Sequence, residues 1–197
     1  MAKDQKPERV YLTSPRGVYQ WPRLNAPDTK FKEEGEYSVS LILKADAPQT
    51  KKFIETLTPH YEAALEAGRE EFKKLKVETR KKLKNITENA LFTEVFDKET
   101  EEPTGEIKFR FTMTASGVSK KTGKAWKRKP KVFDAKGNYM PKPPEIWSGT
   151  EGRVNFELRP YFVPGTGACG LGLRLEAAKI LKLVSEGGAA DASKYGF

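Results

Sequence analysis

The sequence predicts a mainly β fold: a small closed or partly open β-barrel with one helical segment inserted between its strands. Two patterns carry this prediction. Several stretches alternate apolar and polar residues, as strands with one buried face do, and only one stretch has the apolar period of a helix. Gly- and Pro-rich segments separate these stretches. With 197 residues, including 11 Phe, 7 Tyr and 3 Trp, the chain can bury one core.

The first half contains three β segments and the helix. Residues 10–14, 17–20 and 36–43 have strand character, with Tyr37, Val39, Leu41 and Leu43 on one face of the third. We expect the helix to start at Asp46 as N-cap, with Pro48 in its first turn. The apolar face of the helix is formed by Phe53, Ile54, Leu57, Tyr61, Ala64 and Leu65.

The helix is followed by a highly charged segment. Pro59 should kink or interrupt the helix. Residues 69–84 carry eight basic and three acidic side chains, so we expect them to be exposed and helical in their first part. They contain too few large apolar residues to bury in a membrane interface, and no membrane partner is expected.

Strands return in the second half. Ile107, Phe109, Phe111 and Met113 alternate with Lys108, Arg110, Thr112 and Thr114, and further strands are predicted over residues 153–163 and 171–184. Turns are predicted at residues 104–106 and 116–123.

Candidate catalytic and metal-binding features are weak, so we expect no enzyme activity, cofactor or metal. His60 has no accompanying nucleophile motif, and the single cysteine, Cys169, suits a small buried residue. Residues 165–170 match GxGxxG, but a strand pattern follows where a dinucleotide site needs a helix, which favours a hairpin turn. The acids of residues 97–103 lack a regular ligand spacing and indicate a turn.

The charge of the chain predicts a polyanionic partner. The formal net charge is +9, and residues 120–131 (KKTGKAWKRKPK) contain seven Lys or Arg residues, no acid and one tryptophan, Trp126. One interpretation is a basic hairpin with Trp126 packed back onto the barrel. The other is a strand-tracking site, in which cations follow a sugar-phosphate backbone and the indole stacks on an unpaired base.

Several segments, in their order along the chain, resemble the single-stranded DNA-binding proteins of tailed phages, the family typified by the coliphage gene 2.5 protein. The resemblance is carried by residues 14–31 (SPRGVYQWPRLNAPDTKF), 34–43 (EGEYSVSLIL) and 131–184, and by the terminal Phe197. The tail departs from the strongly acidic family pattern, since only Glu186, Asp191 and the terminal carboxylate oppose Lys194.

The resemblance implies a five-stranded OB-fold barrel over residues 1–184 and a flexible C-terminal tail over residues 185–197. It also implies sequence-independent binding and protection of single-stranded DNA in phage replication, recombination and repair, in the cytoplasm of the infected bacterial host. Tyr195 and Phe197 of the tail would contact replication proteins such as a DNA polymerase, and the tail would modulate DNA binding. The oligomeric state is left undetermined.

Candidate DNA-binding residues fall into two groups. Phosphate contacts are assigned to Lys120, Lys121, Lys124, Lys127, Arg128, Lys129 and Lys131, with Arg110 as a further cation. Stacking is assigned to Trp126, with Tyr19, Trp21, Phe31, Tyr139 and Trp147 as secondary candidates, each of which belongs either to the binding surface or to the core. Two alternatives stay open: an RNA-binding OB-fold protein, and an accessory protein that binds duplex DNA.

Overall fold

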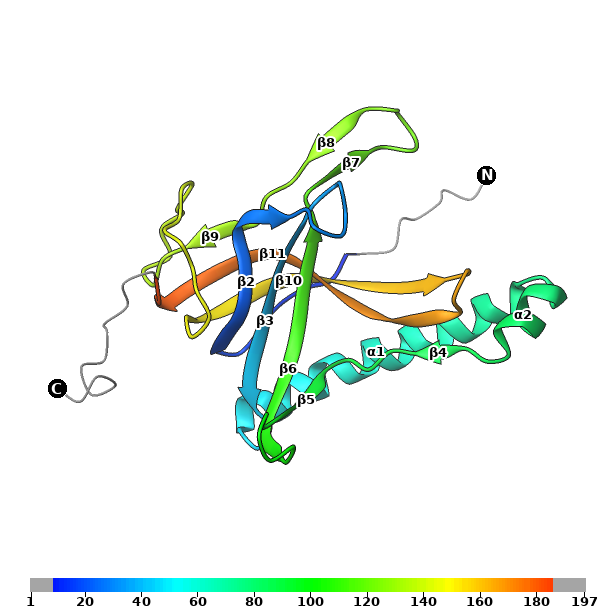
Figure 1. The fold of residues 1–197 in the computed structure, drawn as a ribbon, viewed down its shortest axis with the longest axis horizontal. Coiled ribbons are helices and arrows are strands. Elements are labelled where there is room, and N and C mark those ends of the chain that lie inside the picture. Colours follow the sequence, from blue (N-terminus) through cyan, green and yellow to red (C-terminus); the bar gives the residue numbers. More distant parts are fainter. Residues whose placement is uncertain (1–8, 186–197) are drawn as a thin grey trace.

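Five strands close a barrel in the computed structural model, which describes residues 9–185 (Figure 1). The ring runs through β2 (Gly17–Asp28), β3 (Glu36–Lys44), β6 (Pro103–Thr114), β11 (Ala168–Lys182) and β10 (Glu151–Val163), and β10 pairs again with β2. All of these pairs are antiparallel except β6 with β11, which meet in parallel at Thr112 and Arg174. The predicted barrel is therefore confirmed.

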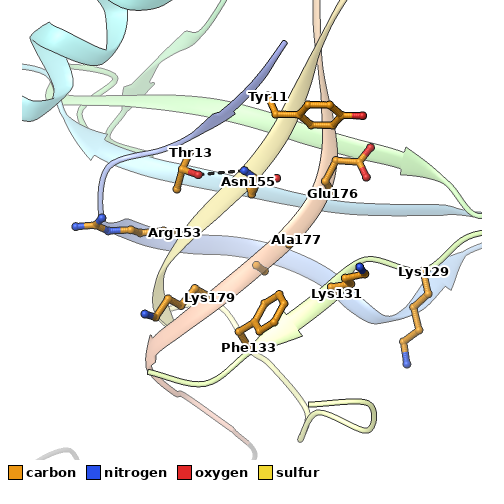
Figure 2. Close-up of a pocket in the computed structure, with 11 residues that line it drawn as sticks. Tyr11, Thr13, Lys129, Lys131, Phe133, Arg153, Asn155, Glu176, Ala177 and Lys179 are labelled. Atoms are coloured by element: carbon orange, nitrogen blue, oxygen red, sulfur yellow. Dashed lines mark hydrogen bonds between the residues drawn. The ribbon is translucent and has the colours of Figure 1, made fainter. Parts of the chain in front are cut away.

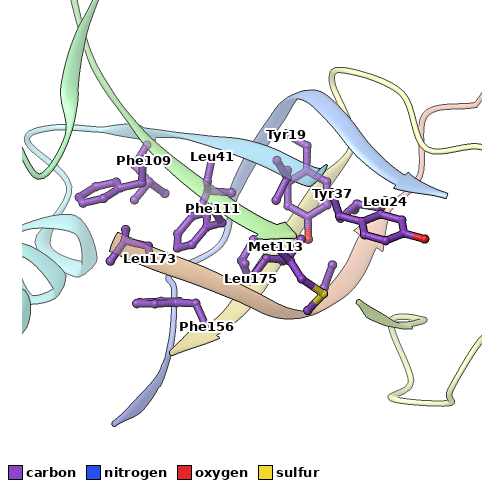
Figure 3. Close-up of a cluster of buried hydrophobic side chains, with 14 of the residues drawn as sticks. Tyr19, Leu24, Tyr37, Leu41, Phe109, Phe111, Met113, Phe156, Leu173 and Leu175 are labelled. Atoms are coloured by element: carbon purple, nitrogen blue, oxygen red, sulfur yellow. The ribbon is translucent and has the colours of Figure 1, made fainter. Parts of the chain in front are cut away.

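The barrel interior is filled by the apolar faces that the alternation predicts. Leu41, Phe109, Phe111 and Phe156 are fully buried, and the rings of Phe111 and Phe156 lie 4.9 Å apart (Figure 3). Burial of each such side chain stabilises the fold by about 1.5 to 3 kcal/mol relative to exposure, so these strands supply much of the driving force for folding.

The inserted helix α1 (Pro48–Lys74) covers one end of the barrel (Figure 1). Phe53 makes edge contacts with Phe109 at 5.1 Å and Phe156 at 5.9 Å, which fixes the helix on the core. Pro48 lies in the first turn, as predicted.

Two details of this helix differ from the prediction. The N-cap is Ala47, which makes no side-chain cap, so the assignment of Asp46 was wrong. The helix also runs through Pro59 without interruption. Proline removes only one hydrogen bond, to the carbonyl of the exposed residue Glu55. Burial of Leu57, before the proline, and of Ala64, after it, outweighs that loss.

A second helix, α2 (Val77–Leu83), follows after an extended Leu75 and buries none of its residues. The basic segment is thus exposed, as expected, but both of its parts are helical. Within residues 9–185, no helix is long and apolar enough to cross a membrane.

Short strands complete the sheet. β4 (Thr87–Glu88) and β9 (Lys131–Phe133) pair with β11, β1 (Tyr11–Thr13) pairs with β10, and β5 (Thr93–Phe96) pairs with β6. Residues 97–102 form a turn between β5 and β6, where the amides of Thr100 and Glu99 donate to Asp97 and lower the pKa of its carboxyl group. The turn predicted at residues 104–106 is wrong, since these residues belong to β6.

β10 and β11 form a long hairpin, so the GxGxxG stretch is a hairpin turn as expected. Gly167 closes the turn at φ 68°, a conformation that favours glycine. Cys169 is fully buried against Gly68 of α1, where an added Cβ would lie 2.5 Å from the cysteine Cβ. This close approach explains the small residues at both positions.

One hairpin stands away from the barrel. β7 (Ser116–Val118) pairs with β8 (Ala125–Lys127) as a separate two-stranded sheet, which projects beside the β2–β3 connection (Figure 1). The turn predicted over residues 116–123 is thus shifted, since residues 116–118 are a strand and the chain reverses at residues 119–124.

Candidate nucleic-acid interface

A groove of about 560 Å³ crosses the outer surface of the β10–β11 hairpin (Figure 2). β1 forms one wall, β9 forms the other, and β10 and β11 form the floor. The lining side chains come from Tyr11, Thr13, Lys129, Lys131, Phe133, Arg153, Asn155, Glu176, Ala177, Ala178 and Lys179.

Strand alternation places the floor residues. Val154, which lies between Arg153 and Asn155, and Phe156, which follows them, are buried in the core. Arg153 and Asn155 therefore point outward. Arg153 lies opposite Lys179 in the ladder, so the two cations stand side by side.

The buried Tyr19 supports the floor of the groove from the core side of the sheet. The hydroxyl of the buried Tyr19 lies 2.8 Å from the carbonyl oxygen of Arg153 and 3.2 Å from that of Lys179, and donates its proton to one of them. Burial raises the pKa of Tyr19, so the hydroxyl stays protonated and able to donate. Gly152 leaves room for the ring, since a Cβ there would lie 2.3 Å from the tyrosine oxygen.

Charge is distributed unevenly along the groove. Lys129, Lys131 and Lys179 lie on the side of β9 and Arg153 lies across β11 on the side of β1, whereas Glu176 lies near Tyr11 (Figure 2). Lys129, Lys131 and Arg153 are exposed, so their charges face solvent and can meet an anion without rearrangement of the core.

Aromatic rings border the same groove. Tyr11 is 46% exposed, and Phe133 lies 5.7 Å, centroid to centroid, from Tyr139, which is 56% exposed. The intervening turn is held by Asp134, whose carboxylate accepts from the backbone N–H and side-chain amide of Asn138. These hydrogen bonds lower the pKa of Asp134 and keep Tyr139 next to the groove.

Trp126 lies on the projecting hairpin and not in the barrel core. Its ring rests on Gly117, where a Cβ would approach the indole to 2.6 Å, and the Arg128 guanidinium lies over the ring at 4.4 Å from the centroid. Trp126 also lines a depression of about 600 Å³ that includes Glu33 and Glu34. A base that stacks on the face covered by Arg128 would therefore displace the guanidinium or stack on it.

The structure divides the basic run of residues 120–131 between two places. Lys120, Lys121 and Lys124 are exposed in the turn of the projecting hairpin, and Lys127 and Arg128 follow at its base. The amide of Arg128 donates to the carbonyl of Ala115 at 2.7 Å, which anchors this base. Lys129 and Lys131 continue into the groove, so one chain segment links the two surfaces.

The remaining predicted residues lie elsewhere. Trp21, 71% exposed, and Trp147, 46% exposed, line a separate pocket of about 570 Å³. Phe31 is 85% exposed in the β2–β3 connection, and Arg110 on the outside of β6 pairs with Glu36 at 3.4 Å.

Tyr19 is a correction. It was assigned to stacking, but its side chain is fully buried and its ring cannot meet a base. Its hydroxyl finds hydrogen-bond partners on two distant strands, which is what permits a tyrosine to be buried at this position.

Two further points concern the C-terminal tail and metal binding. Tyr195 and Phe197 lie outside the described residues, as does most of the predicted tail. Within residues 9–185 no cluster of three His, Cys, Asp or Glu side chains could hold a metal ion.

Of the eleven residues that line the groove, the sequence predicted only Lys129 and Lys131 as binding residues. Arg153 and Asn155 carried a signal, because they lie on the polar face of a predicted strand. Tyr11, Phe133 and Lys179 carried none that distinguishes them from other strand residues, since only pairing of β1 and β9 with the hairpin brings them together.

The sequence of the chain matches a family of phage proteins. Residues 12–183 match the family described as "Single-stranded DNA-binding protein, Bacteriophage T7". A single-stranded DNA-binding protein of Enterobacteria phage T3 is 25% identical over 190 residues, which cover 93% of this chain and 80% of the relative.

Solved structures share the fold. The crystal structure of gp2.5, a single-stranded DNA-binding protein encoded by bacteriophage T7, superimposes with a TM-score of 0.72 at 24% identity and covers 96% of both chains. The single-stranded DNA-binding protein of bacteriophage Enc34, in complex with single-stranded DNA, gives a TM-score of 0.54 at 14% identity, covering 89% of this chain and 88% of that one.

Proposed function

The chain belongs to the bacteriophage T7 family of single-stranded DNA-binding proteins, and we propose on this basis that it binds single-stranded DNA in the groove between β1 and β9. The observation that carries the proposal is the combination within one groove of four cations with the exposed ring of Tyr11 and the half-buried ring of Phe133. Cations follow the phosphates of a single strand, and aromatic rings stack on its unpaired bases.

The projecting hairpin extends this surface. Lys129 and Lys131 connect the groove to Arg128 and Trp126, so a strand that leaves the groove along β9 meets the rest of the basic run. Lys120, Lys121, Lys124 and Lys127 would add phosphate contacts, and Trp126 a stacking contact of about 1 to 3 kcal/mol. Tyr139 joins the groove through Phe133.

Trp21, Phe31 and Trp147 remain proposed as additional stacking sites, on the support of their exposure. Arg110 remains a proposed phosphate contact, although its guanidinium must then share its charge with Glu36. None of these four residues lines the groove.

A single strand is favoured over a duplex because stacking on Tyr11 or Tyr139 requires a base with a free face, which a duplex hides. RNA offers the same phosphates and base faces, so the 2′-hydroxyl is the feature that separates the two. A titration with one sequence as single-stranded DNA, duplex DNA and RNA tests the proposal. We expect the DNA single strand to bind most tightly, and equal binding of the duplex would contradict stacking in the groove.

The biological role follows from the same proposal. Coating of single strands by a binding protein without catalytic activity would serve phage DNA replication, recombination and repair in the cytoplasm of the infected bacterial host. The family match and the names of the relatives support this role. Release of nucleotides by the purified protein in the presence of magnesium or manganese would contradict it.

The C-terminal tail is proposed to modulate binding. The chain leaves β11 beside the pocket lined by Val184, and its last residues include Glu186, Asp191, Tyr195 and Phe197. These carboxylates and rings could compete with DNA for cations and stacking surfaces at the high effective concentration of a tethered segment. DNA would then release Phe197 for a replication protein such as a polymerase.

A further inference from the structure

The groove carries a feature that phosphate binding does not explain. Glu176 presents a carboxylate at the end beside Tyr11 and Asn155, away from the cations near β9 (Figure 2). Lys129, Lys131 and Lys179 draw the backbone of a bound strand towards their end of the groove, whereas Glu176, whose charge is partly balanced by Arg174, offers a hydrogen-bond acceptor and no cation. A base that extends from that backbone can reach Glu176.

A β-bulge directs Glu176 to this place. Asn155 lies opposite Ala177 in the ladder and Phe156 lies opposite Leu175, so Glu176 has no partner on β10. An extra residue of this kind changes the direction of its side chain relative to regular alternation.

The carboxylate is also held in a fixed orientation. Arg174 donates to Oε1 of Glu176 from Nε at 2.8 Å and from an Nη at 2.5 Å. The same guanidinium pairs at 2.5 Å with Glu157, whose carboxylate is buried. Both contacts to Glu176 use Oε1, and within residues 9–185 no hydrogen bond reaches Oε2.

Asn155 supplies a second acceptor next to it. Its Nδ2 donates to the carbonyl of Leu12 and to the hydroxyl of Thr13, both at 3.1 Å, and these bonds fix the orientation of the amide. Both bonds use the amide nitrogen, which leaves Oδ1 as an acceptor. This end of the groove is therefore rich in acceptors, with Tyr11 as a flat surface beside it.

We propose that Glu176 and Asn155 form a base-reading site that favours a base with an exocyclic amino group over thymine. Cytosine, adenine and guanine present amino donors to such acceptors, whereas thymine presents two carbonyl oxygens and a single N–H between them. The inference rests on the proposed function, and it adds a modest base preference to binding that is otherwise independent of sequence.

The test compares oligomers of equal length made of dC or dT, so that the same base occupies the site in every register. The wild-type protein should bind dC about three- to tenfold more tightly, the range that one net hydrogen bond supplies. Glu176→Gln should tighten binding of both oligomers, because a negative charge is lost, and the dC to dT affinity ratio should fall towards one. A Gln amide serves both bases, since it can accept from cytosine and donate to thymine.

Glu66→Gln is the matched control. Glu66 pairs with Arg69 at 3.2 Å on α1, so this variant changes the net charge equally outside the groove. The control should retain the wild-type ratio of affinities. A dC oligomer with dimethylated N4 amino groups tests the same contact on the wild-type protein without a substitution, and it should bind as weakly as dT.

The outcomes separate the inference from the function on which it rests. Tight binding of both oligomers with equal affinity, or an unchanged ratio in Glu176→Gln, would overturn the base-reading site and leave the groove in place. Failure of the protein to bind any oligomer would overturn the proposed function itself. If Glu176→Gln does not fold, the dimethylated oligomer decides, because its retained affinity would refute the contact.

Discussion

Removal of two groove cations should lower the salt dependence of DNA binding by a defined amount. Each phosphate neutralised on a single strand contributes about 0.7 to the slope of log affinity against log salt. The four cations of the groove therefore contribute about −2.8 to the slope of the wild-type protein, and contacts of the projecting hairpin add to it. Lys131→Ala combined with Lys179→Ala removes two groove contacts and should make the slope shallower by about 1.4.

The slope translates into affinities that are easily separated. Between about 50 and 200 mM salt, the groove contacts should account for about a 50-fold loss of affinity in the wild-type protein and about a sevenfold loss in the double variant. Anisotropy of one labelled oligonucleotide at several salt concentrations measures both values. Thermal unfolding checks that the groove walls are intact, which we expect because Lys131 is exposed and Lys179 is only partly buried.

Two matched variants give the prediction its specificity. Lys81→Ala with Lys82→Ala removes the same charge from the exposed helix α2, which lies on the far side of the molecule from β9 (Figure 1), and should leave the slope unchanged. Lys120→Ala with Lys121→Ala tests the projecting hairpin. If the groove variant keeps the wild-type slope while the hairpin variant loses about 1.4, the phosphates lie on the hairpin and the reasoning from the groove is refuted.

Further predictions concern stacking, the support of the groove and the tail. Trp126→Ala should weaken single-strand binding by about 1 to 3 kcal/mol without a change of salt slope, and a titration at two salt concentrations shows whether it does. Tyr19→Phe should lower the free energy of unfolding in urea by about 1 to 2 kcal/mol, because a buried carbonyl loses its donor. Gly152→Ala should cost about 1 to 3 kcal/mol or more in the same assay through its overlap with Tyr19, and an unchanged midpoint would contradict the packing. Deletion of residues 185–197 should tighten DNA binding, most at low salt, and abolish partner binding, whereas equal affinities of the full-length and truncated proteins at both low and high salt would exclude competition by the tail.

Local sequence patterns were sufficient to predict the strands of the barrel. Alternation along residues 36–43 and 107–114 identified the inward faces of β3 and β6, because side chains of a strand point to opposite faces with a period of two. The same reasoning identified the hairpin turn near Gly167 and the exposed basic helix. Each of these properties depends on residues that are close in the chain.

Short segments were less well determined by the same pattern. Alternation defines two faces of a strand but does not say which one is inside, so the sequence left Tyr19 open between stacking and the core, and it is buried. Its burial depends on the carbonyl groups of Arg153 and Lys179, more than a hundred residues later in the chain. Trp21 lies at an interruption of the β2–β3 ladder with φ 50°, so regular alternation does not describe its direction either.

The sequence by itself determined the charge of the protein, its strand and helix composition and the basic run with Trp126. Only the tertiary structure divided that run between hairpin and groove. It also placed Lys131 in one groove with Arg153, Lys179 and Tyr11. The physical reason is that periodicity acts over a few residues, whereas the groove is set by the pairing register of β1, β9, β10 and β11 and by one bulge at Glu176. A register shift of one residue would turn these side chains to the opposite face, and packing of the whole barrel core selects the register that is seen.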